Sequence, residues 1–160
     1  MVVVAIIGIL AAVGIPSFKK YQAKAKTAEA KIHLTAIYTV ETTLQAEFDT
    51  YNPCLSKIGY NPSAESSNRY YRTGFNNSDP TNTDICGVGG FSFGFPAGRA
   101  AGGPPAASFD AYISTSVVRV SDDGTSFLAA AIGWVSPDRV SPDYWGINHN
   151  KNITHTSVGY

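Results

Sequence analysis

This sequence lacks a net charge. Twelve lysines and arginines balance twelve aspartates and glutamates, so the formal net charge at pH 7 is zero. Without a global basic field, non-specific nucleic-acid binding is not indicated. The first fifteen residues carry no charged and no hydrogen-bonding side chain. Charge begins only after them, with the lysines Lys19, Lys20, Lys24, Lys26 and Lys31.

Cysteine is also scarce. Cys54 and Cys86 are the only two, and they lack the C-x-x-C spacing of zinc and redox sites. An even pair in an exported protein favours one disulfide, with two independent buried thiols as the alternative. A bridge would close a loop of about thirty residues and stabilise the fold by ~3–4 kcal/mol in the chain-entropy model.

Patterns for chemistry are poorly represented. His33, His149 and His155 are too scattered in the sequence for a metal cluster, and there is no phosphate-binding loop. We therefore expect no enzyme, no cofactor and no metal. Cations and aromatic rings mix in one stretch, which can bind single-stranded nucleic acid, but a tyrosine-rich surface loop has the same composition and is the interpretation we favour. The residues are Lys57, Tyr60, Arg69, Tyr70, Tyr71, Arg72 and Phe75.

The apolar N-terminus is what the sequence has in excess. As a helix, fifteen residues span about 22 Å, which is most of a membrane span but short of the ~30 Å hydrocarbon core. A cleaved signal would carry its basic residues before the apolar run, and a core or interfacial helix would carry a polar face. We expect burial in a membrane or against copies of the same helix for Val2, Val3, Val4, Ile6, Ile7, Ile9, Leu10, Val13 and Ile15.

Beyond this segment, apolar residues recur at three- and four-residue steps until Asn52-Pro53 ends the helix near Tyr51. This periodicity predicts that one stripe packs on a sheet: Tyr21, Ala25, Ala28, Ile32, Val40 and Leu44. Gly8, Gly14 and Pro16 weaken the helix, so we interpret them as a soft joint, with an ordinary proline kink as the alternative.

The remaining sequence predicts short strands joined by turns. Expected strands lie within 69–75, 91–95, 109–120, 125–135 and 144–148, with a turn at 122–124 and a hairpin or tail after 148. The run 97–105 is rich in glycine, alanine and proline and predicts a flexible excursion, while the repeated Val-Ser-Pro-Asp at 135–138 and 140–143 predicts a two-corner loop.

Met1 to Gln22 closely resembles the N-terminal helix of bacterial type IV pilins. The likeness is specific through about Ala30 and looser from there to about Tyr51. The stretch 143–148, Asp-Tyr-Trp-Gly-Ile-Asn, is similar to an Asp-x-Trp-x-Ile-Asn stretch in many pilin headgroups. In that family a prepilin peptidase removes a basic leader, and the mature chain begins with an N-methylated Phe and carries a Glu shortly after it. This sequence opens inside that motif, so we expect a truncated or misannotated start.

The resemblance implies an α+β pilin fold, with a long N-terminal helix packed on an antiparallel sheet of about four strands. We expect a membrane or filament-core segment at 1–16, an amphipathic half-helix at 17–51 and a headgroup at 52–160. The implied function is a structural subunit of a type IV pilus that serves adhesion, twitching motility or DNA uptake. Its expected partners are copies of itself, the inner membrane before assembly and the pilus assembly machinery. A minor pilin or pseudopilin of a secretion or competence system, and a membrane-anchored periplasmic binding protein, are the alternatives.

Overall fold

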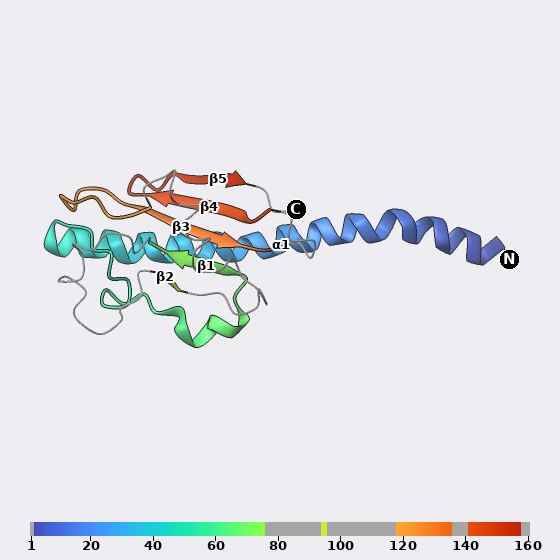
Figure 1. Ribbon diagram of the computed structural model, residues 1–160, viewed down its shortest axis with the longest axis horizontal. Helices are drawn as coiled ribbons and strands as arrows, with labels where there is room; N and C mark the ends of the chain where they lie inside the picture. The colour runs from blue at the N-terminus through green and yellow to red at the C-terminus, as the bar shows by residue number, and fades with distance from the viewer. Residues whose placement is uncertain (1, 76–93, 96–117, 136–140, 158–160) are drawn as a thin grey trace.

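A computed structural model of the chain describes residues 2–75, 94–95, 118–135 and 141–157. Figure 1 shows a long helix whose C-terminal half lies along a sheet and whose N-terminal half projects beyond the headgroup. The elements are α1 (Val2–Phe48), the 3-10 helix η1 (Pro62–Asn68), and the strands β1 (Tyr71–Gly74), β2 (Gly94–Phe95), β3 (Leu128–Gly133), β4 (Asp143–Asn148) and β5 (Ile153–Ser157).

The sheet has the order β2-β1-β3-β4-β5, and every neighbouring pair is antiparallel. The predicted α+β architecture, a long helix on an antiparallel sheet, is thereby confirmed. Among the described residues the sheet has five strands where about four were expected, and the extra edge strand, β2, has two residues. The central pair β3–β4 places Ala131 opposite Trp145, so a small residue faces the largest one across the ladder.

Helix α1 ends three residues earlier than the sequence suggested, because the chain turns at Asp49. That residue has a positive φ of 57°, and its N–H donates to the carbonyl of Gln45 at 2.9 Å. A left-handed residue directly after a helix is a common way to stop it. Pro53 follows and cannot continue a helix.

The turn at 122–124 forms as predicted and holds the end of α1. The N–H of Tyr51 donates to the carbonyl of Gly124 at 2.9 Å. Gly124 has φ +66°, and a Cβ there would lie 2.0 Å from Oγ1 of Thr50. Only glycine fits this position, because both the backbone conformation and the close approach of Thr50 exclude a side chain.

The sheet is packed on both faces. Residues that alternate along β3 separate into two clusters: Ala129 and Ala131 belong to the main core with α1, while Ala130 and Ile132 belong to a smaller cluster with Val118. This is the period of two expected in a strand. The small alanines on the helix side allow α1 to approach closely.

The predicted packing face of α1 is wrong for its first four residues. Tyr21, Ala25, Ala28 and Ile32 are exposed, whereas Val40 and Leu44 are half-buried at the border of the contact. The buried stripe is Ala23, Thr27, Ala30, Leu34, Ile37 and Glu41. It lies two residues further along, which is about 200° round a helix and hence the opposite side. Small and polar residues face the sheet, so the larger apolar side chains misled the prediction.

Several predictions fall wholly or partly outside the described residues. These include Cys86, the excursion at 97–105, most of the first Val-Ser-Pro-Asp repeat and nearly all of the strand expected at 109–120. Of that strand, Val120 forms an isolated bridge with Phe127. The strand expected at 91–95 is described only at Gly94–Phe95.

Candidate functional site: the exposed half of the helix

The N-terminal segment of α1 has no intramolecular partner. Every residue from 2 to 22 is exposed, and the first buried side chain of the helix is Ala23. Nine large aliphatic side chains are 52–73% exposed; they are Val2, Val3, Val4, Ile6, Ile7, Ile9, Leu10, Val13 and Ile15. At ~1.5–3 kcal/mol for each buried side chain, covering this rod would release on the order of 10–25 kcal/mol. We call residues 2–15 the apolar rod.

By length and composition, α1 is able to cross a membrane. Its most apolar 18-residue stretch has a mean hydropathy of 2.2, and none of that stretch is buried within the protein. A core helix of a soluble protein would be mostly covered by its own chain. This segment is not covered at all, so it is not a core helix of the described headgroup.

Gly8, Gly14 and Pro16 all lie inside α1, which continues through them without a break. A Cβ placed on either glycine would meet no other atom within 4 Å. These glycines are therefore not required by packing in the single chain. The softening that we predicted for this segment must be tested on the helix itself.

The basic residues after the rod divide into two groups. Lys26 donates to the carbonyl of Val135 at 3.1 Å and lies over the Tyr70 ring at 4.8 Å, while Lys31 lies over Trp145 at 4.7 Å. In the part of the chain that the structure describes, no ion pair involves Lys19, Lys20 or Lys24, which are all exposed.

Glu41 is an unexpected buried acid on the face of α1 that meets the headgroup. It is 0% exposed, and its Oε2 accepts a hydrogen bond from the N–H of Asn52 at 3.1 Å. Its Oε1 has no hydrogen-bond partner among the described residues. Burial raises the pKa of Glu41 to about 8, because an ionised carboxylate loses its hydration there. Glutamate is rarely buried completely, so its residue type would place Glu41 at the surface, and the structure does not.

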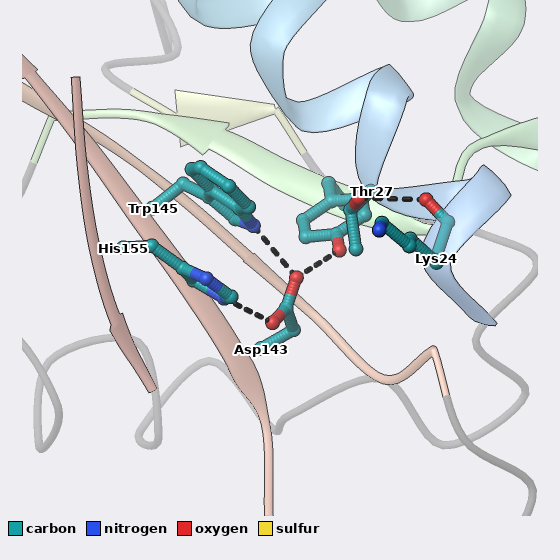
Figure 2. A network of polar contacts seen from close by, with 6 residues as sticks. Lys24, Thr27, Asp143, Trp145 and His155 are labelled. Atoms are coloured by element: carbon teal, nitrogen blue, oxygen red, sulfur yellow. Dashed lines mark hydrogen bonds and ion pairs between the residues drawn. The ribbon is translucent and has the colours of Figure 1, made fainter. Parts of the chain in front are cut away.

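Asp143 at the start of β4 ties three strands together. Its side chain is fully buried and accepts hydrogen bonds from the Tyr71 hydroxyl of β1, from Nε1 of Trp145 at 2.7 Å and from Nε2 of His155 in β5 at 2.7 Å (Figure 2). The His155 ring stacks on Trp145 at 3.9 Å between centroids. Burial, with the Asp143 contact next, raises the pKa of the Tyr71 phenol, so Tyr71 is a donor.

Sequence reasoning missed this cluster, although a signal was present. Asp143 and Trp145 are two residues apart and therefore lie on the same face of a strand, where an indole N–H needs an acceptor. Figure 2 also shows Thr27 of α1, whose hydroxyl donates a hydrogen bond to the carbonyl of Lys24 within the same helix at 2.7 Å. The cluster connects strands to one another and presents no side chain as an evident nucleophile.

The possible nucleic-acid surface is not formed. Tyr60, Arg69, Tyr71 and Phe75 are at most 7% exposed, so their rings and cation are unable to stack on bases. Arg69 instead donates to Oγ1 of Thr73 at 2.7 Å within the core. Four of the seven residues thus belong to the interior of the headgroup, so the surface loop that we favoured for this stretch is wrong for them.

His33 lies in the middle of α1 and is half-buried, so its ring is only partly solvated. Its Nδ1 lies 3.0 Å from the hydroxyl of Tyr60, and burial lowers the pKa of His33. Glu29, one turn earlier, accepts from the N–H groups of Tyr70 and Tyr71 at 2.8 and 3.0 Å. Burial raises the pKa of Glu29 against the effect of these bonds. Both side chains serve the helix–headgroup contact.

Two features bear on chemistry. Among the described residues, no three His, Cys, Asp or Glu side chains gather as they would around a metal. The stretch 90–94, Gly-Phe-Ser-Phe-Gly, does match the spacing of a nucleophile elbow, which the sequence reasoning overlooked. An elbow needs a strand followed by a helix, whereas Gly94 here begins strand β2. Residues 90–93 are outside the described residues.

An open groove of about 440 Å³ lies beside the C-terminal end of α1. Its apolar lining comes from Val40, Leu44 and Phe48 of the helix and from Ile58 of the following loop, and Glu47 and Lys57 also border it. Phe48 is 67% exposed. The groove thus continues the exposed apolar surface at the end of the helix opposite the rod.

Comparison with known proteins supports the resemblance drawn from the sequence. Over 70 residues, which are 44% of this chain, the sequence is 50% identical to the type IV major pilin protein PilA of Myxococcus xanthus (strain DK1622). The matched part spans 31% of that protein. No protein-family model matches the chain. The similarity to a type IV pilin is therefore confirmed, and the long apolar helix and antiparallel sheet agree with the pilin fold.

Proposed function

We propose that this chain is a structural subunit of a type IV pilus. The apolar rod of each subunit is held in the inner membrane before assembly and is buried among the rods of other subunits in an extracellular filament. The pilus assembly machinery moves it from one environment to the other. Residues 1–16 serve the membrane and filament core, 17–51 join rod to headgroup, and 52–160 form the outer headgroup.

The exposed rod is the observation that carries this proposal. Its nine large aliphatic side chains are on average more than half exposed, and the headgroup begins to cover the helix only at Ala23. Water is a poor solvent for such a surface. A bilayer covers it in a single subunit, and identical rods cover one another in a filament, because a heterologous contact that does not close generates a helical polymer.

Polymerisation after detergent removal tests the proposal. The full chain, extracted in a mild non-ionic detergent, should form filaments that sediment and are visible by electron microscopy once the detergent is removed. Ile6→Arg and Ile9→Asp should abolish them, because each places a charge where rods or lipid meet. Asn150→Arg in the β4–β5 turn is the matched control, since it adds the same charge at an exposed headgroup site. Discrete monomers from the unsubstituted chain would contradict the proposal.

The alternatives make different predictions. A minor pilin or pseudopilin would contribute a small fraction of the filament mass, whereas a major pilin makes up most of a sheared surface filament. A membrane-anchored periplasmic binding protein would stay monomeric after detergent extraction. The 50% sequence identity over 70 residues to a major pilin protein favours a major pilin over these alternatives.

We also propose the Cys54–Cys86 disulfide as the covalent closure of the segment after the helix. In its support, Cys54 is 0% exposed and lies in the segment that follows the end of α1 at Phe48. Mass spectrometry of the unreduced protein should give a peptide that links the two cysteines. Alkylation of either thiol without reduction would contradict the bridge.

A further inference from the structure

Four of the eight lysines and glutamates of α1 contact their own headgroup: Lys26, Glu29, Lys31 and Glu41. Of its carboxylates, Glu29 accepts two backbone N–H groups and Glu41 is buried, which leaves Glu47 exposed, with Asp49 just beyond the helix. The five lysines separate in the same way, since Lys26 and Lys31 lie over headgroup rings. The charges left over are positive near the rod and negative at the far end.

The face of α1 turned away from the sheet is continuous and largely apolar in its first half. At 100° per residue, its members fall within an arc about 100° wide. All are exposed; we call them the outward stripe: Phe18, Tyr21, Ala25, Ala28, Ile32, Thr39, Thr43 and Glu47. Phe18, Tyr21 and Ile32 are each 67–73% exposed. The groove beside Leu44 adjoins the far end of this stripe.

The exposed charges that form no ion pair among the described residues define one spacing. Lys20 and Glu47 are 27 residues apart, and Lys24 and Asp49 are 25 residues apart. A parallel copy of the helix shifted by about 26 residues, or ~40 Å, would bring both pairs together. In this register Ile6 of one copy lies beside Ile32 of the other, and Val13 lies beside Thr39. Apolar and charged contacts thus agree on a single offset.

We propose that the outward stripe of α1 binds the apolar rod of a second copy, parallel and shifted by about 26 residues, with Lys20 and Lys24 of that copy against Glu47 and Asp49 of the first. This inference depends on the proposed filament and adds its axial register. The apolar contacts hold the rods together without fixing an offset, because a uniform aliphatic surface slides easily. The ion pairs select one offset, since like charges meet or opposite charges separate in others.

Cysteine cross-linking measures the register directly. The variant Lys20→Cys/Glu47→Cys should give disulfide-linked dimers and a ladder of multimers when filaments are mildly oxidised, and so should Ile6→Cys/Ile32→Cys. Lys20→Cys/Ile32→Cys is the matched control, because its two sites are also exposed but only 12 residues apart. The unsubstituted chain, with Cys54 and Cys86 alone, gives the background. Filaments in which the 20/47 pair stays uncross-linked overturn the register.

Charge reversal tests whether the ion pairs between the two copies set the register. Lys20→Glu and Glu47→Lys should each raise the lowest concentration that yields filaments by about two- to five-fold at low salt, since an exposed ion pair shifts an equilibrium by about this factor. The double variant Lys20→Glu/Glu47→Lys should restore assembly, and about 1 M salt should remove the differences. Equal assembly by all three variants at low salt overturns the proposal. If the unsubstituted chain forms no filaments, the proposed function itself fails.

Discussion

At the scale of single residues, Asp143 has more structural consequence than its place in the sequence suggested. It is fully buried and accepts hydrogen bonds from side chains of β1, β4 and β5. Removing a buried acceptor leaves its donors without water to replace it, so the cost exceeds that of the lost bonds. The acid therefore fixes the position of β5, the edge strand, relative to the centre of the sheet.

Asp143→Ala should lower the free energy of unfolding by about 3–5 kcal/mol, because two buried donors, Tyr71 and Trp145, and the half-buried His155 lose their acceptor. Thermal unfolding followed by near-UV circular dichroism in non-ionic detergent would measure this. Asp122→Ala is the matched control; its carboxylate side chain is 75% exposed and 3.9 Å from Arg119. It should change stability by at most about 0.5 kcal/mol. Equal melting of both variants would contradict the role of Asp143.

Glu41 makes stability depend on pH. Its pKa is about 8 in the folded chain against an ordinary value of 4.5, so the folded state binds more protons than the unfolded state between these limits. The contribution of the neutral carboxyl is fully present below pH 4.5 and is lost as pH rises through about 8. Unfolding of the unsubstituted chain should become easier by on the order of a few kcal/mol across this window.

Glu41→Gln isolates this contribution, because glutamine keeps the shape and the acceptor for the Asn52 N–H but does not ionise. The variant should match the unsubstituted chain near pH 4.5 and exceed its stability above pH 8. All other titrating groups contribute equally to both proteins, so the difference between their pH profiles belongs to Glu41. Parallel profiles over this range would show that Glu41 is ionised in the folded state.

At the scale of elements, α1 presents two stripes with the same helical period. The stripe of large apolar residues faces outward, while the sheet is covered by Ala23, Ala30, Leu34 and Ile37 with the polar Thr27 and Glu41. Leu34→Ala should cost about 2–5 kcal/mol of headgroup stability, as expected for a fully buried leucine. Ile32→Ala, two positions away and 67% exposed, should change it by at most about 0.5 kcal/mol. If Ile32→Ala cost more stability than Leu34→Ala, the packing face predicted from the sequence would be the correct one.

The two stripes of α1 separate the features that can be predicted from the sequence from those that cannot. The helix, its end near Pro53, the turn at Gly124 and strands β3 and β4 are all local patterns, so periodicity and turn residues predict them. The buried face depends on partners distant in sequence, such as Asn52 for Glu41 and Ala131 for the small residues of α1. Large outward residues such as Ile32 look like core residues when a second copy of the chain is their partner.

The joint within α1 gives a prediction at the same scale. Gly8→Ala/Gly14→Ala should strengthen the helix by ~1 kcal/mol per site, since neither added methyl meets another atom. In micelles, amide hydrogen exchange between residues 8 and 16 should slow accordingly. If the segment must soften during assembly, filaments should also grow more slowly. Faster exchange in the variant, or unchanged exchange with unchanged growth, would contradict a soft joint.

At the scale of the whole molecule, rod and headgroup are separate in their energetics. In the described chain, each residue before Ala23 is exposed, and the core cluster on the helix side of the sheet begins at that residue. The rod therefore adds nothing to the stability of the headgroup, and the headgroup does nothing to hide the rod. Their connection is mechanical, through a single helix of 47 residues.

Deletion of residues 1–16 tests this separation. The shortened chain, which begins at Ser17, should be soluble without detergent, and its headgroup should unfold within about 0.5 kcal/mol of the full chain, because no core residue is removed. It should sediment as a monomer, since Phe18 and Ile32 lack a rod to bind. The full chain with Ile6→Arg is the matched control, because it keeps the rod but loses its apolar continuity. A shortened chain that unfolds far more easily would mean that the rod is part of the folded unit, and one that still forms filaments would place assembly in the headgroup.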